Sequence, residues 1–166
     1  MARSTAGEEI DFESLYRRSR DDVYAYVAGM VRDRAAAEEV TAVAFERAFR
    51  RRSSYSPARG SPRAWLFGIA RNAAYDELRR RGRTEPVAEP EERRPPAGDA
   101  TADVALRRAA LSAALATLSQ DERELVALKF EAGLANAEIG TVLAISETNV
   151  GTRLSRVVAK LRAAIG

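Results

Sequence analysis

"NAEIGTVLAISETNVGTRLSRV", residues Asn136 to Val157, contains two short runs of helical apolar spacing separated by a polar break at Ser146. The spacing predicts one helix over 135–143 and a second over 147–164, with Ser146 placed to cap the second. Gly140 would let the two helices approach closely. The pattern therefore predicts a helix-turn-helix, although a plain helical hairpin also fits the spacing.

In a helix-turn-helix, the first turns of the second helix present side chains to the major groove. The side chains predicted to face outward here are Glu147, Thr148, Asn149, Thr152, Ser155 and Arg156, with Arg153 as a further basic residue. Hydroxyl and amide groups can contact base edges, and arginines can contact guanine or phosphate. The turn residue is Ala144, where a positive φ would cost an alanine about 1 kcal/mol.

Helical apolar spacing continues along the rest of the chain, and no stretch shows the alternation of a strand. Four of the six prolines lie in 84–103, which has few large apolar residues and therefore predicts an extended linker. The fold class predicted is all-α, with two small helical domains, 10–83 and 104–166, joined by a flexible acidic linker. The sequence leaves open whether these two lobes pack together.

Charge follows the same division: the net charge is +5 over 1–83, −4 over 84–103 and +2 over 104–166. Two basic lobes suit a polyanion contacted in two places, although ordinary solvated charge fits equally well. The chain has no histidine and no cysteine, which excludes disulfides, the usual zinc sites and Ser-His or Cys-His catalysis. We expect no metal, no cofactor, no small-molecule substrate and no enzymatic activity. With no signal peptide or long apolar run, we expect a cytoplasmic protein that does not insert into a membrane.

The stretch "SPRAWLFGIARNAAYDELRRRGR", residues 61–83, predicts a basic helix opened by a serine cap and a proline. Trp65, Leu66, Ile69, Ala70 and Ala73 share one face and are expected in a core. Asn72, Tyr75 and Arg79 follow one another at helical spacing on another face, with Arg59 and Ser61 in the loop before the helix. An amide, an aromatic ring and arginines suit a strand with accessible bases, although a solvated, arginine-rich helix end is the simpler alternative.

Nearly the whole chain resembles the extracytoplasmic-function (ECF) sigma factors of bacterial RNA polymerase. The resemblance rests on "DRAAAEEVTAVAFERAF", on "AWLFGIARNAAYDELRRR", which is the most specific phrase, and on "LATLSQDERELVALKFEAGLANAEIGTVLAISETNVGTRLSRVVAKLR". It implies that the first lobe is sigma region 2, which binds the polymerase clamp helices and melts the −10 promoter element. The second lobe would be region 4, which recognises the −35 element and sits on the polymerase flap. An anti-sigma factor is the usual partner that regulates such proteins.

The resemblance also implies roles for particular residues. Asn72 matches the residue that holds a flipped base of the −10 element, and Arg59 and Ser61 lie in the specificity loop beside it. The implied clamp-binding residues are Glu38, Glu39, Thr41 and Phe45, and the implied −35 contacts are Thr148, Asn149, Thr152, Ser155 and Arg156. Two departures from the family pattern weaken these implied contacts. Ala42-Val43 replaces a common Gln-Glu on the clamp-binding surface, and Gly151 replaces a common basic residue of the recognition helix.

Two other classes of protein compete with this interpretation. A homodimeric helix-turn-helix regulator would need a dimer helix or a sensor domain, and neither is evident. It would also leave the linker and the Asn72 face unexplained. An enzyme is disfavoured because there is no His or Cys, no Gly-rich phosphate loop and no convincing carboxylate pair.

Overall fold

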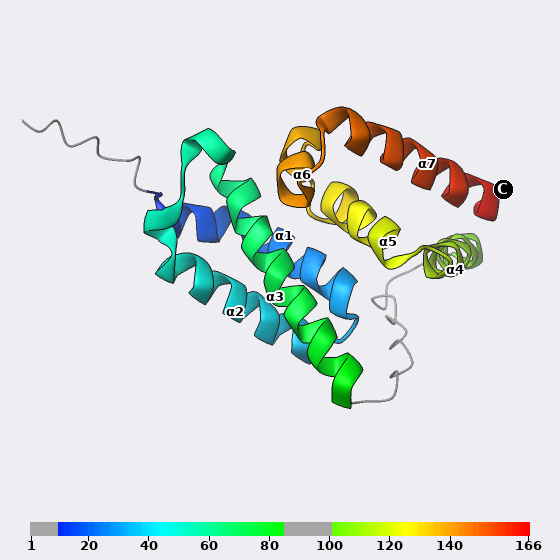
Figure 1. Ribbon diagram of the computed structural model, residues 1–166. Coiled ribbons are helices and arrows are strands. Elements are labelled where there is room, and N and C mark those ends of the chain that lie inside the picture. Colours follow the sequence, from blue (N-terminus) through cyan, green and yellow to red (C-terminus); the bar gives the residue numbers. More distant parts are fainter. Residues whose placement is uncertain (1–9, 85–100) are drawn as a thin grey trace, which may run out of the picture.

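The computed structural model describes residues 10–84 and 101–166, and all regular secondary structure in these ranges is helical. The first lobe contains α1 (Phe12–Val31), α2 (Arg34–Arg50) and α3 (Pro62–Thr84), and the second contains α4 (Ala102–Ala116), α5 (Gln120–Val126), α6 (Asn136–Leu143) and α7 (Glu147–Ile165) (Figure 1). The all-α prediction is confirmed. The predicted linker over 84–103 lies almost entirely outside the described residues.

Local sequence explains where most of these helices begin. Asp11, Asp33, Ser119 and Ser146 each accept a hydrogen bond from the backbone N–H three residues later. Ser119 and Glu122 form a reciprocal capping box. Two 3-10 turns, Arg52–Ser54 and Pro57–Arg59, join α2 to α3, and α5 continues into a π-helical turn, Ala127–Glu131.

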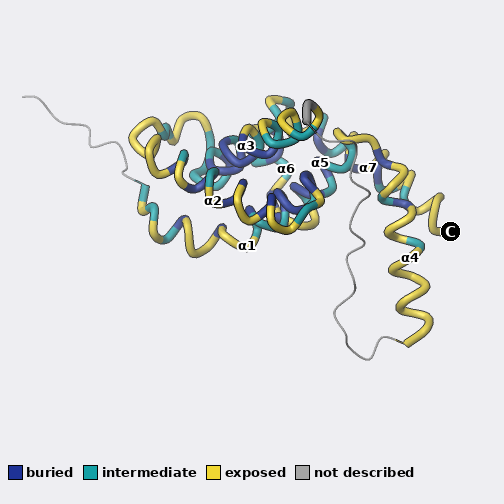
Figure 2. Tube along the Cα trace, turned by 90° about the horizontal axis from the view of Figure 1, so that it is seen from below, coloured by how far each residue is buried: buried dark blue, intermediate teal, exposed yellow. Residues whose placement is uncertain are grey.

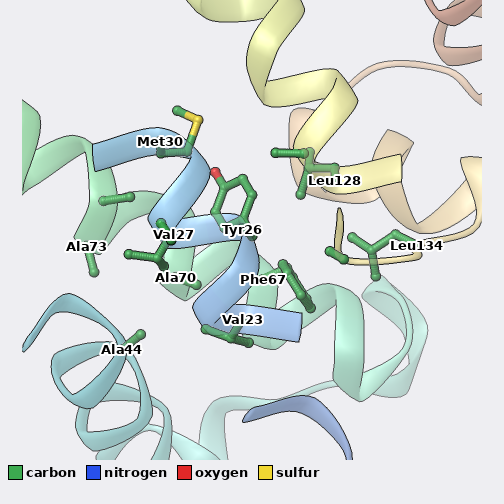
Figure 3. Close-up of a cluster of buried hydrophobic side chains, with 14 of the residues drawn as sticks. Val23, Tyr26, Val27, Met30, Ala44, Phe67, Ala70, Ala73, Leu128 and Leu134 are labelled. Carbon is green, nitrogen blue, oxygen red and sulfur yellow. The ribbon is translucent and has the colours of Figure 1, made fainter. Parts of the chain in front are cut away.

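The first lobe is a three-helix bundle in which every pair of helices packs together. Val23 and Val27 of α1 lie on the side of small residues of the other two helices, including Ala44 and Ala70 (Figure 3). The core predicted for α3 is confirmed at Leu66, Ile69, Ala70 and Ala73. Trp65 is only half-buried, because its ring lies at the lobe surface, edge-on to Tyr55 with centroids 5.9 Å apart.

The two lobes pack together and share one hydrophobic cluster. Leu128 and Leu134 of the second lobe face Tyr26 and Phe67 of the first (Figure 3). α3 packs on α6, while α1 packs on α5 and the π-helical turn. By contrast, α4 contacts mainly α7 and is exposed along most of its length (Figure 2). The sequence leaves open whether the two lobes pack together, and the structure shows that they do.

The turn of the helix-turn-helix stores the predicted backbone strain. Ala144 has φ 56° and ψ 42°, in the left-handed region. We expect Ala144→Gly to raise the free energy of unfolding by about 1 kcal/mol, because glycine adopts this conformation without steric cost. Urea denaturation measures the change. The control is Ala159→Gly, at an exposed position inside α7, which should lower stability by about 1 kcal/mol. If both variants are less stable than the original protein, the left-handed backbone at Ala144 is not strained.

Candidate nucleic-acid interface

The helix-turn-helix is built by close backbone contact between α6 and α7. The Ile145 N–H donates to the Gly140 carbonyl at 3.0 Å, and the Ser146 hydroxyl accepts from the Asn149 N–H at 3.1 Å. A Cβ on Gly140 would lie 2.7 Å from the Ile145 carbonyl oxygen, so glycine is required there. The buried residues Ile139, Val150, Leu154 and Val157 hold α7 in place. The structure therefore contains the short helix, tight turn and second helix that the sequence predicts.

The first turns of α7 form a polar surface, which we call the α7 face. Thr148, Thr152, Arg153, Ser155 and Arg156 are exposed, and Asn149 is half-buried. Some of these groups bond to each other: the Thr152 hydroxyl donates to the Thr148 carbonyl, and Arg153 Nε donates to Asn149 Oδ1, both at 3.1 Å. Among the described residues, Arg156 has no hydrogen-bond or ion-pair partner. Its guanidinium is therefore available to a ligand.

The polar residues predicted on α3 are brought onto one side of the helix, but their surroundings differ. Asn72 is exposed, whereas Tyr75 is half-buried and lies under the Arg71 guanidinium, 4.8 Å from the ring centroid. Burial and, secondly, the Glu124 carboxylate raise the pKa of Tyr75. Arg79 pairs with Asp76 at 2.6 Å, and this hydrogen bond is the main reason that the pKa of Asp76 is lowered. The charge of Arg79 is thus partly balanced within the lobe.

The two residues predicted to contact DNA from the loop before α3, Arg59 and Ser61, differ: Arg59 is exposed, whereas the Ser61 side chain is hydrogen-bonded. Arg59 is exposed at the end of its 3-10 turn. The Ser61 hydroxyl accepts from the Ala64 N–H at 3.1 Å and donates to Glu138 Oε2 of α6 at 3.0 Å. Glu138 Oε1 also accepts from the Ala135 N–H, at the start of α6. Ser61 therefore caps α3 and contacts the second lobe at the same time.

The four residues proposed for polymerase binding do not form one surface on α2. Glu38 and Glu39 are exposed, but Thr41 and Phe45 are buried. The Thr41 hydroxyl donates to the Ala37 carbonyl, and the Phe45 ring packs edge-on against Tyr16. Thr41 and Phe45 are 8% and 6% exposed and pack against the α2 backbone and α1, so their part in polymerase binding stays a prediction.

Sequence reasoning missed a buried polar cluster between the lobes. Glu124 of α5 has a side chain only 3% exposed. Its Oε2 accepts from the Tyr26 hydroxyl at 2.8 Å, and its Oε1 accepts from Arg71 Nε at 3.0 Å. Burial and, secondly, the Glu124 charge hold the pKa of Tyr26 well above its usual value, so the phenol stays neutral. The signal in the sequence is a glutamate four residues before Leu128, on the apolar side of α5.

A cavity of about 350 Å³ opens beside this cluster. It is lined by residues of α3, α5, α6 and α7: Arg71, Asp121, Glu122, Glu124, Leu125, Leu143, Arg153, Arg156 and Val157. Two arginines of the α7 face and Arg71 of α3 therefore share one space with three carboxylates. Within residues 10–84 and 101–166, no group of His, Cys, Asp or Glu side chains could hold a metal ion. No helix in these ranges is long and apolar enough to cross a membrane.

A helical protein with this helix-turn-helix and a second polar helix face belongs to the DNA-binding class. The family model "Sigma-70 region 2" matches residues 15–84, and "Sigma-70, region 4" matches 108–161. The RNA polymerase sigma factor CarQ of Myxococcus xanthus is 37% identical over 100% of this chain and 95% of its own length. The ECF RNA polymerase sigma factor SigK of Mycobacterium sp. (strain KMS) is 29% identical over 100% and 89%.

A solved structure has a similar fold. The sigma factor RpoE from Bartonella quintana, in complex with the anti-sigma factor NepR, superposes with a TM-score of 0.74 and 23% identity, over 93% of this chain and 96% of that one. The two family models and the relatives CarQ and SigK show that the chain belongs to the ECF sigma factors of RNA polymerase. It is a sigma factor for promoter-specific initiation of transcription.

Proposed function

We propose that the two lobes divide promoter recognition between them, with residues 10–83 acting on the −10 element and 104–166 on the −35 element. The observation that supports this most directly is the presence of two separate polar helix faces, Asn72 on α3 and the start of α7. Major-groove contacts suit the α7 face, because its exposed hydroxyls and arginines lie at the start of a recognition helix. The residues 84–103 would join the two activities as a linker.

Asn72 is suited to hold an unstacked base. Its amide is exposed on α3, one turn before Tyr75, whose ring is half-buried under the Arg71 guanidinium in this arrangement. Extruding a base from the duplex costs a few kcal/mol, which a base pocket and phosphate contacts can offset. Arg59 and Arg79 would supply phosphate contacts on either side.

Partner binding follows from the family assignment. We propose that Glu38 and Glu39 contact the clamp of core RNA polymerase, and that the second lobe sits on the flap. The protein would act in the cytoplasm as a non-catalytic initiation subunit. Because RpoE was solved with the anti-sigma factor NepR, we also propose an anti-sigma partner here.

In vitro transcription tests the proposal: purified core polymerase, GC-rich promoter fragments and this protein as the sole added factor. Discrete transcripts with defined start sites are the expected result. Silence, together with tight binding of the protein alone to a palindromic site, would instead favour a dimeric regulator.

Arg156→Ala should weaken binding to the upstream element about tenfold or more, because a base-edge contact contributes about 1–3 kcal/mol. Promoter binding by the polymerase–sigma complex measures it, on DNA with an intact or a scrambled −35 element. Arg162→Ala, an exposed arginine in the last turn of α7, is the control and should change little. Equal loss on scrambled DNA would show that Arg156 contacts phosphate only.

A further inference from the structure

Glu124 is a second-lobe carboxylate whose hydrogen-bond partners all lie in the first lobe. It is the only acidic or basic side chain among the described residues that is buried. A buried carboxylate costs several kcal/mol unless its partners compensate, and a buried ion pair adds little net stability over an apolar contact. Beside the hydrophobic cluster that the lobes share, this ion pair is the part of the interface in which another anion could replace one partner.

Arg71 is the partner that a different ligand could bind. Its side chain is 34% exposed and stacks on the Tyr75 ring. Arg71 directly precedes Asn72 in the sequence. Guanidinium donors fit carboxylate and phosphate oxygens with the same geometry. The Glu124 carboxylate of α5 thus binds the Arg71 guanidinium of α3, whose donors could bind a DNA phosphate in the same way.

In this arrangement the second lobe covers part of the α3 surface, while the start of α7 stays exposed. The cavity beside Arg71 is lined by Glu124 and also by Arg153 and Arg156 of the α7 face. On the other side of the interface, Ser61 of the specificity loop is bonded to Glu138 of α6. Acidic residues of the second lobe therefore engage the first-lobe surface at two points.

We propose that Arg71 is a further phosphate-binding residue of the −10 surface, and that Glu124 occupies it in the compact arrangement as an internal substitute for phosphate. The inference rests on the proposed function of α3. The lobes must separate before Arg71 can offer a strand the donor that Glu124 occupies, and the strand and Glu124 compete for the same guanidinium. Glu124 and DNA are thus alternative partners of one side chain.

Two readouts on the full chain test this. The chain has no cysteine, so cysteines introduced at the exposed positions Ala42 and Ala159 report the separation of the lobes by energy transfer between two dyes. Fluorescence anisotropy with a labelled single-stranded oligonucleotide of mixed sequence reports strand binding over a series of salt concentrations.

Glu124→Gln keeps the shape of the side chain and removes its charge. Energy transfer should fall, and the Kd for the oligonucleotide should fall about tenfold, because apparent affinity scales with the open fraction. Glu46→Gln, an exposed acid on α2, makes the same change in net charge outside the interface and should leave the energy transfer unchanged. If Glu124→Gln changes neither readout, Glu124 does not mask the surface.

The double variant Arg71→Gln with Glu124→Gln isolates the arginine, because it leaves no unpaired buried charge. Relative to Glu124→Gln alone, it should bind the oligonucleotide more weakly, with a salt slope smaller by about 0.7, the value for one phosphate contact on a single strand. Equal affinity and slope in both variants would show that Arg71 only holds the lobes together. If these results hold while transcription remains silent, the proposed initiation role fails and the competition between Glu124 and the strand stands.

Discussion

Asn72→Ala should reduce the rate of open-complex formation about ten- to a hundredfold, while binding of the protein to core polymerase stays unchanged. The physical reason is that a flipped base needs a hydrogen-bonding partner in place of its lost pairing, and such a contact is worth about 1–3 kcal/mol. Asn72 is exposed on α3, so its truncation leaves the core of the first lobe intact. Permanganate footprinting of the −10 region measures the melted state directly.

Two controls separate melting from other defects. On a template with a preformed bubble at the −10 element, much of the Asn72→Ala defect should disappear, because the energy of unpairing no longer has to be supplied. Gln120→Ala removes another exposed amide, at the start of α5, and should melt the promoter normally. Normal melting by Asn72→Ala on duplex DNA would remove the flipped-base assignment.

Gly140→Ala should disrupt the helix-turn-helix and reduce binding to the upstream element at least tenfold. The added Cβ would lie 2.7 Å from the Ile145 carbonyl oxygen. This is a backbone atom that can move only if α7 moves. Forcing an atom into such a packed site costs about 1–3 kcal/mol, which exceeds the gain of up to about 1 kcal/mol in helix propensity. Urea denaturation and promoter-binding assays measure the two effects.

Gly151→Ala is the matched control within the same motif. A Cβ at Gly151 meets only the Asn136 side chain, at 4.0 Å, which is ordinary contact. This variant should therefore gain up to about 1 kcal/mol of stability from helix propensity and bind DNA as before. If Gly140→Ala is as stable as Gly151→Ala, the close approach at the turn is not required.

The helices and their ends could be predicted because the signals are local. Apolar spacing of three and four residues, together with caps at Ser119 and Ser146, locates the helices to within a few residues. The left-handed Ala144 is predictable for the same reason, since a two-helix turn demands one such residue. The face of the recognition helix follows directly from these positions.

The site on the first lobe is predicted less completely. Thr41 and Phe45 match a family surface by position, yet they are buried, because neighbouring helices decide which side of α2 is covered. Tyr75 and Ser61 are also expected to face DNA, and both are engaged with or turned toward the second lobe. A helical wheel shows which residues share a side but not what covers that side.

The sequence by itself therefore determined the fold class, the helix-turn-helix and the two polar helix faces of this protein. Only the tertiary structure decided that the lobes pack together and that Glu124 bonds to Arg71 and Tyr26. These partners are 53 and 98 residues away from Glu124 along the chain, and Ser61 lies 77 residues from Glu138. Periodicity and capping act over three or four residues, whereas contacts at such separations depend on which complete surfaces meet in space.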